Sequence, residues 1–121
     1  MSQRQNISSG SEWEPKIGYS RAVRIGNHIA VSGTTGQGAT AGEQARAALE
    51  TIERALVEAG GSLQDVIRTR IYLTDVSLWQ EVAAVHGEIF ASTRPASTLL
   101  GVGALIDEAL FVEIEADAIV S

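Results

Sequence analysis

Near the C-terminus, one acidic side chain lies in a setting that favours proton transfer. Glu113 follows Phe111 and Val112 in an apolar run, and Glu115 and Asp117 come two and four residues later on the same face of an expected strand. A carboxylate that is partly removed from water has a raised pKa, which suits it for taking and returning a proton. We therefore expect Glu113 to belong to a functional site, whereas Glu115 and Asp117 have the pattern of a solvated acidic stripe.

Residue types that bind metals or act as strong nucleophiles are scarce in the chain. It has no cysteine, and its two histidines, His28 and His86, show no paired ligand spacing, so we expect no metal site and no thiol chemistry. Ser97 is accompanied by neither a Gly-x-Ser-x-Gly elbow nor a Ser-His-acid set, which argues against a serine nucleophile. Segment 33–42 is rich in glycine but lacks the Gly-Lys-Ser/Thr ending of a phosphate-binding loop.

The composition is that of an ordinary globular domain with an acidic charge. Of 121 residues, 45% are hydrophobic and 20% are charged, which fits one compact core and excludes disorder for the bulk of the chain. Nine Lys and Arg residues against fifteen Asp and Glu leave a net charge of −6, which opposes binding to nucleic acids and anionic membranes. The first residues form no apolar leader, and no apolar run reaches the roughly 18 residues of a membrane span. We expect a cytoplasmic protein with neither nucleic acid nor membrane as partner.

Apolar periodicity predicts one domain over residues 1–121, which begins with an irregular arm, residues 1–17, held by Trp13. Strand-like alternation covers residues 20–25, 28–33, 66–73, 97–103 and 110–120. Helical spacing covers residues 43–59 and a second stretch that starts at Ser77 as N-cap and ends before Arg94-Pro95. Gly26-Asn27 suits the tight turn of a hairpin. The predicted order is ββαβαββ, an α+β fold with two helices on one face of a mixed sheet.

The expected sheet has a second face that the chain itself cannot cover. Residues 98–102 and 110–112 are apolar at consecutive positions, which indicates burial on both faces of the sheet. Two helices cover only one face, and no further element remains in the sequence. We therefore expect another copy of the chain to cover the second face in a closed homo-oligomer. Arg68 and Arg70 are expected to meet acidic residues across that interface.

Five short motifs, in this order, resemble those of the reactive-intermediate deaminase family, also called RidA/YjgF and, in older usage, endoribonuclease or perchloric-acid-soluble protein. The motifs are Gly18-Tyr19-Ser20, Val31-Ser32-Gly33, Ile71-Tyr72-Leu73-Thr74-Asp75, Arg94-Pro95-Ala96 and Glu113-Ile114-Glu115-Ala116. The resemblance runs from about Gly18 to the C-terminus.

The resemblance implies a chorismate-mutase-like subunit in a homotrimer, with the sheets packed inward and three clefts between neighbouring subunits. It also implies a small-molecule ligand, because family enzymes hydrolyse enamines and imines such as 2-iminopropanoate and 2-iminobutanoate without metal or organic cofactor. In those enzymes an arginine two residues after the proline clamps the substrate carboxylate. The first glutamate of Glu-Ile-Glu-Ala positions or activates water, and the tyrosine of the first motif lines the cleft.

Carried over by position, Tyr19 and Glu113 match the family's tyrosine and glutamate as catalytic residues, whereas the arginine does not match. Ser97 stands at the position of the clamp, Ala83 stands where an asparagine is common, and His86 stands where a tyrosine is common. A serine offers one neutral donor where arginine offers two charge-assisted hydrogen bonds, a difference of about 3 kcal/mol. The ligand is then either not an anionic imino acid, or another cation replaces the clamp. The expected substrate-binding residues are Ser32, Gly33, Ser97, Thr98, His86 and the replacement cations Arg21 and Arg94.

Three functions remain open at this point. The first is hydrolytic deamination, with water added to a C=N carbon beside Glu113. The second is a non-catalytic trimer that keeps the pocket for ligand binding or interaction. The third, ribonuclease activity, follows older family usage and is opposed by the charge of −6.

Overall fold

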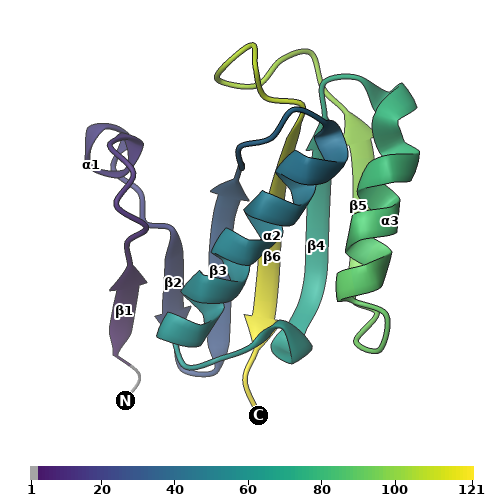
Figure 1. Cartoon of the computed structure of the whole chain (residues 1–121). Coiled ribbons are helices and arrows are strands. Elements are labelled where there is room, and N and C mark those ends of the chain that lie inside the picture. The colour runs from purple at the N-terminus through teal and green to yellow at the C-terminus, as the bar shows by residue number, and fades with distance from the viewer. Residues whose placement is uncertain (1–2) are drawn as a thin grey trace.

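One mixed sheet of six strands organises the computed structural model, which describes residues 3–121 (Figure 1). The strands are β1 (Arg4–Ile7), β2 (Ala22–Ile25), β3 (His28–Thr34), β4 (Val66–Leu73), β5 (Ala96–Gly101) and β6 (Val112–Ile119). They lie in the order β1-β2-β3-β6-β4-β5, and only β4 and β5 are parallel. The predicted α+β fold is confirmed, and from β2 onward the elements follow the predicted order ββαβαββ.

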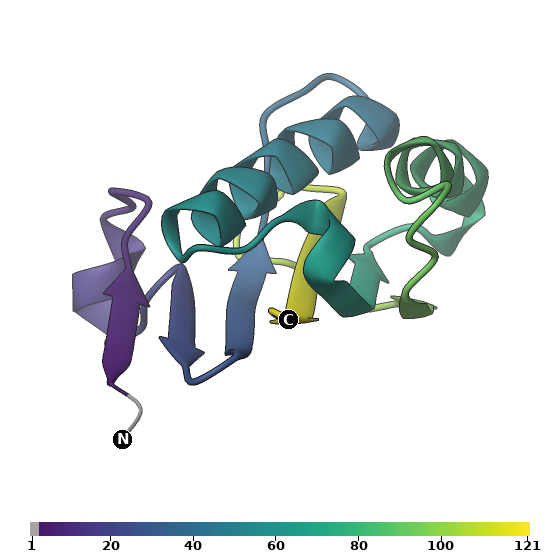
Figure 2. The same cartoon turned by 90° about the horizontal axis from the view of Figure 1, so that it is seen from below.

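Two long helices cover one face of this sheet, as predicted. Viewed from below, α2 (Ala41–Glu58) and α3 (Trp79–Ile89) both lie on the same side of the strands (Figure 2). The apolar stripe of α2 packs on the alternating buried residues of β3 and β6 and against α3. Thr40 caps α2, because its hydroxyl accepts the Glu43 backbone N–H at 3.1 Å.

The predicted start of the second long helix is wrong. A 3₁₀ turn, Val76–Leu78, precedes α3, and α3 begins at Trp79. The side chain of Asp75 caps that turn by accepting the backbone N–H of Ser77 at 3.0 Å. Asp75 therefore takes the capping role that Ser77 was expected to have. Trp79 is 47% exposed. A second 3₁₀ turn, Leu63–Asp65, leads into β4.

The predicted irregular arm contains regular structure. Residues 4–7 form β1 on the edge of the sheet, and a short helix, α1 (Trp13–Ile17), follows. Only Ile7 of β1 is buried, so backbone pairing with β2 holds the strand and no alternation of apolar residues reveals it. Trp13 is 42% exposed and does not hold the arm by burial. Met1 and Ser2 lie outside the described residues.

The sheet face opposite the helices is open in the single chain. Every residue of β5 except Leu99 is exposed, and Ile119 at the end of β6 is 47% exposed. Arg70, on this face, meets Glu115 at 3.2 Å and Asp117 at 3.3 Å within its own chain. The acidic stripe is thus paired rather than simply solvated, and Arg70 is not the free intersubunit partner that we expected. Within residues 3–121, no helix is both long and apolar enough to cross a membrane.

A β-bulge near the end of β3 shapes the region where the site forms. Val31 is in register with Ala116 and Thr34 with Ile114, so β3 carries one extra residue over this stretch. The extra residue lies in the Ser32-Gly33 pair. The bulge brings the Gly33 backbone against the start of β6, where Glu113 lies.

Candidate active site

Five of the predicted site residues line one cavity of about 630 Å³: Tyr19, Arg21, Ser32, Gly33 and Glu113. The cavity lies at the end of the sheet where β3 leaves for the glycine-rich loop and β6 begins. Its rim includes loop residues 106–110 and the side of α1. These five residues come from separate predicted strands and loops, and the fold brings them together at one cavity.

Glu113 is the titratable group in this cavity with the clearest perturbation. Its carboxyl is half-buried, and burial, helped by the negative charge of Glu115, raises its pKa, whereas Arg21 acts weakly in the opposite direction. The carboxyl lies against Gly33, where a β-carbon built on the glycine would be 2.7 Å from Oε2. Glycine is therefore required at this bulge for the carboxyl to occupy its position. The arrangement fits a base that takes a proton from water.

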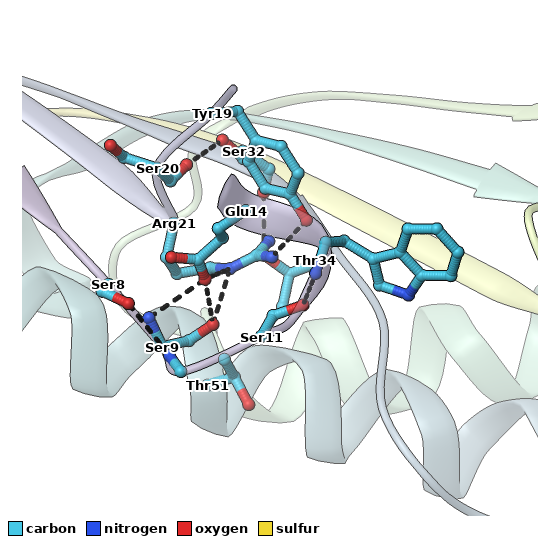
Figure 3. Close-up of polar contacts among 12 residues, drawn as sticks. Ser8, Ser9, Ser11, Glu14, Tyr19, Ser20, Arg21, Ser32, Thr34 and Thr51 are labelled. Atoms are coloured by element: carbon cyan, nitrogen blue, oxygen red, sulfur yellow. Dashed lines mark hydrogen bonds and ion pairs between the residues drawn. The ribbon is translucent and has the colours of Figure 1, made fainter. Parts of the chain in front are cut away.

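Arg21 is built into the wall of the cavity rather than free to bind an anion (Figure 3). It is 6% exposed, and its Nη1 donates to the Gly33 carbonyl at 2.6 Å and to the Thr34 hydroxyl at 3.0 Å. Its Nη2 donates to the Tyr19 hydroxyl at 3.2 Å. Arginine has five N–H donors, and these contacts already use three of them. The guanidinium thus fixes the bulge and the tyrosine.

A buried carboxylate balances the charge of Arg21. Glu14 of α1 is 5% exposed, and its Oε2 lies 4.0 Å from Nε of Arg21 (Figure 3). The same oxygen accepts the hydroxyl of Ser9 at 2.6 Å and the backbone N–H of Ser9 at 3.1 Å. Burial by itself raises the pKa of Glu14, but the hydrogen bonds from Ser9 and Ser8 and the charge of Arg21 outweigh it and lower the pKa. Arg21 and Glu14 are therefore both ionised and mutually neutralised.

The sequence analysis missed Gln44, which shapes the rim of the cavity. Its side chain is buried on α2, donates to the carbonyls of Gly38 and Ala109 and accepts the backbone N–H of Phe111 at 2.8 Å. One amide thus joins the glycine-rich loop to the segment that leads into β6. A polar residue beside Ala41, Ala45 and Ala48 on the apolar stripe was the available signal, because a buried amide must find partners.

The remaining predicted site residues form a second group at the β5–α3 end of the sheet. His86, half-buried on α3, and the exposed Arg94 line a hollow of about 380 Å³, and Arg94 follows the helix with a φ of 50°. Ser97 and Thr98 are exposed on β5. Thr69, which was not singled out, joins this group because its hydroxyl lies 2.8 Å from both His86 Nε2 and Ser97 Oγ.

Within one chain Ser97 and Glu113 lie on opposite faces of the sheet, whereas Thr98, in register with Arg70, lies on the open face. Ser97 is in register with Thr69, whose side chain is fully buried beneath the helices. Glu113 is in register with Tyr72, three residues further along β4, and therefore points to the open face. Ser97 and Glu113 of the same chain consequently cannot meet across one small ligand.

A larger groove of about 930 Å³ lies on the other side of Arg21, between the loop after β1 and α2. Nearly half of its lining residues carry hydroxyl groups, among them Ser8, Ser9 and Thr51. Of the residues predicted for the site, only Arg21 borders it. The groove is the larger hollow, but the perturbed carboxyl is in the smaller cavity, which we take as the candidate active site.

Comparison with known proteins identifies the family of the chain. The sequence profile of the family described as endoribonuclease L-PSP matches residues 10–120. The chain belongs to this family. A crystal structure of Rv2704 from Mycobacterium tuberculosis, described as a member of the YjgF/YER057c/UK114 family, is 54% identical with a TM-score of 0.96, covering 98% of this chain and 100% of that one. Membership of the RidA/YjgF family, expected from the motifs, is therefore confirmed.

Two relatives in the L-PSP family show the range of names attached to it. The Streptomyces coelicolor protein named uncharacterized protein SCO2049 is 37% identical over 122 residues, which is 94% of this chain and 90% of the relative. A Dermatophagoides farinae protein named 2-iminobutanoate/2-iminopropanoate deaminase is 30% identical over 128 residues, which is 99% of both chains.

We expect Gly33→Ala to displace the Glu113 carboxyl of this L-PSP family member without unfolding it. The added methyl group would lie 2.7 Å from Oε2 and 2.9 Å from Cδ of Glu113, and a flexible side chain moves more readily than two strands. The pKa of Glu113, followed by carbon NMR, should fall toward the ordinary glutamate value as the carboxyl moves into water. Gly87→Ala, where nothing lies within 4 Å of an added β-carbon, is the control. An unchanged Glu113 titration in Gly33→Ala would contradict this packing.

Proposed function

We propose that the protein hydrolyses a small imine or enamine to a carbonyl compound and ammonia. The observation that carries the proposal is the half-buried Glu113, whose pKa is raised in a cavity that also holds Tyr19, Ser32 and the Gly33 backbone. A carboxylate poised in this way can take a proton from a water molecule as the water attacks a C=N carbon. The deaminase name of a relative that spans 99% of the chain supports the same chemistry.

The charge around the cavity favours a substrate without a carboxylate. Glu113 and Asp107 line it, and Arg21 is its lining cation, buried and paired with Glu14. An anionic imino acid would meet two carboxylates there without a free guanidinium to bind it. Protonated imines carry a positive charge that the same carboxylates attract. The proposed substrate class is therefore a neutral or cationic imine or enamine.

The proposed site forms between two copies of the chain in a homotrimer. Ser97 and Glu113 lie on opposite faces of one sheet, so only two copies can place them on one ligand. The open face, with Leu100 at 40% and Ile119 at 47% exposure, offers apolar surface for such contact. The Glu113 group would then come from one copy and the Ser97 group from its neighbour, with the family's trimer as the assembly.

Ammonia release tests the reaction and the substrate class together. Imines without a carboxylate can be generated in situ by an amine oxidase, and 2-iminopropanoate and 2-iminobutanoate by an amino-acid oxidase. We expect the wild type to accelerate hydrolysis of the first group more than the second. Arg94→Ala should leave this preference unchanged. Turnover of the imino acids that disappears in Arg94→Ala would instead identify Arg94 as a substitute clamp.

Ser97→Arg should shift the preference toward imino acids. An arginine at this position supplies two charge-assisted hydrogen bonds to a carboxylate, so kcat/KM for 2-iminopropanoate, relative to that for an imine without a carboxylate, should rise roughly tenfold to a hundredfold. Ser97→Lys is the matched control, because it adds the charge without the planar fork and should gain less. Equal rates in wild type and Ser97→Arg on every substrate would contradict a role for this position in substrate choice.

A further inference from the structure

Ser97, Thr69 and His86, at the β5–α3 end of the sheet, form a continuous line of hydrogen bonds that has no role in the reaction as described above. The Thr69 hydroxyl lies 2.8 Å from Ser97 Oγ and 2.8 Å from His86 Nε2. Thr69 is fully buried, His86 is half-buried and Ser97 is exposed. The line therefore starts at a hydroxyl on the surface and ends at an imidazole under the helix.

The line has a direction when His86 is neutral. A hydroxyl has one proton, so Thr69 can donate to one neighbour and must accept from the other. When the proton of the neutral imidazole is on Nδ1, Nε2 accepts from Thr69 and Ser97 donates to Thr69; when it is on Nε2, both hydrogen bonds run the other way. Burial lowers the pKa of His86, so the imidazole is neutral near pH 7. In the Nδ1–H tautomer, on which the proposal below depends, the line can carry a proton inward from Ser97.

The charged groups around His86 do not oppose this direction. Arg94 lines the same hollow as His86 and brings no negative charge to it. On the α2 side, Arg46 is paired with Glu88. β4 turns Arg68 and Arg70 to the opposite face of the sheet, and β5 has no charged residue. Phe90, whose ring centre is 4.6 Å from that of His86, packs against the imidazole.

We propose that Ser97 is a catalytic residue of the proposed deaminase and that it passes a substrate proton through Thr69 to His86. Thr69 and His86 are then positioning residues that give an exposed serine an internal proton acceptor. This inference rests on the proposed function, because Ser97 meets substrate only in the cleft shared with Glu113 of a neighbouring copy.

The proton balance divides the work between Glu113 and this line. Water adds to the carbon of an iminium ion while Glu113 takes one proton from that water, which leaves a neutral carbinolamine. Glu113 returns the proton to nitrogen, and the hydroxyl proton of the carbinolamine passes to Ser97 as Ser97 and Thr69 each pass their own proton inward to His86. The C–N bond breaks with its electron pair on ammonia as C=O forms. The proton then returns from His86 through Thr69 and Ser97 to ammonia, which restores the line, so iminium and water become a carbonyl compound and ammonium.

Rates of ammonia release as a function of pH test this assignment, with an imine that carries no carboxylate as substrate. Thr69→Val and Ser97→Ala should each lower kcat by about a hundredfold with little change in KM. Thr69→Ser keeps a hydroxyl at the same place and should retain most of the activity. Melting temperatures of all three variants report whether the fold survives.

The pH profile separates proton transfer from a purely structural role. In the wild type, both Glu113 and His86 must be deprotonated, so log kcat should fall with a slope approaching two in acid. His86→Gln, which does not titrate, should show a slope of one and a lowered plateau. Wild-type kcat and slope in Thr69→Val would overturn the relay while leaving the deaminase proposal intact. No turnover by the wild type would overturn both.

Discussion

Glu113→Gln is expected to lower kcat for imine hydrolysis by about a hundredfold to ten-thousandfold. Glutamine keeps the size and hydrogen-bonding shape of the side chain against Gly33, but it cannot take a proton from water. The folded protein should not suffer, because a raised pKa means that the fold disfavours the ionised form of Glu113. Protonated Glu113 stabilises the wild type at low pH, and this stabilisation is lost as the pH rises through the raised pKa of Glu113. Glu113→Gln should therefore melt at or above the wild-type temperature at pH 7.

Glu115→Gln is the matched control for this substitution. Glu115 lies two residues along the same face of β6, but it bonds Arg70 and the Tyr72 hydroxyl and does not line the cavity. Its loss should leave kcat near the wild-type value above neutral pH. Because the charge of Glu115 helps to raise the pKa of Glu113, the acid limb of the activity profile should move to lower pH. Equal losses in both variants would mean that negative charge, and not a base at position 113, matters.

Arg21→Met should destabilise the protein by roughly 3–5 kcal/mol, because it leaves the buried Glu14 without its cation. The variant also loses the hydrogen bonds to the Gly33 carbonyl and the Thr34 hydroxyl, so the bulge beside Glu113 loosens. Urea unfolding of the wild type and the variant measures the difference. Activity should fall together with stability.

Arg24→Met is the control, because it removes an arginine without leaving a buried carboxylate unpaired. Arg24 donates to the carbonyls of Gly26 and Ala59 and has no acidic partner among residues 3–121, so its removal should cost about 1–2 kcal/mol. Replacing Glu14 as well, in Arg21→Met/Glu14→Leu, should restore part of the loss. A loss below about 1 kcal/mol in Arg21→Met would contradict the buried pair.

Acid should weaken the wild type through the same pair. The pKa of Glu14 is lowered in the folded state, so the stability that Glu14 contributes is present above its unfolded pKa and is lost as pH falls through the lowered value. Glu14→Gln should lack this part of the acid dependence.

Periodicity was sufficient for the elements that build the core. The strand predicted at residues 66–73 is observed with the same limits, because its buried residues Thr69, Ile71 and Leu73 alternate with polar ones. Regular alternation along this strand predicts that Ile67 is buried on the same face as Thr69, Ile71 and Leu73, and this prediction is wrong. A register shift between Val66 and Arg68 buries Val66 and leaves Ile67 49% exposed. Bulges depend on the neighbouring strand, so alternation along one strand does not reveal them.

Several residues of the candidate site could be named from the sequence, but the hydrogen bonds and ion pairs among them could not. Sequence motifs singled out Glu113, Gly33 and Arg21, and the structure places all three at one cavity. Arg21 was expected as a replacement clamp, and its burial against Glu14 shows a structural role instead. Glu14 and Ser9 come from the arm, where no periodicity pointed to them. Such contacts arise from tertiary packing of segments that are distant along the chain.

The most direct test of the central claim is ammonia release from an imine without a carboxylate, measured with the wild type and Glu113→Gln side by side. We expect the wild type to accelerate hydrolysis well above the spontaneous rate and Glu113→Gln to lose nearly all of that acceleration. Equal rates in the two proteins, or no acceleration by a correctly folded wild type on any imine tested, would contradict the assignment of this cavity as a deaminase site.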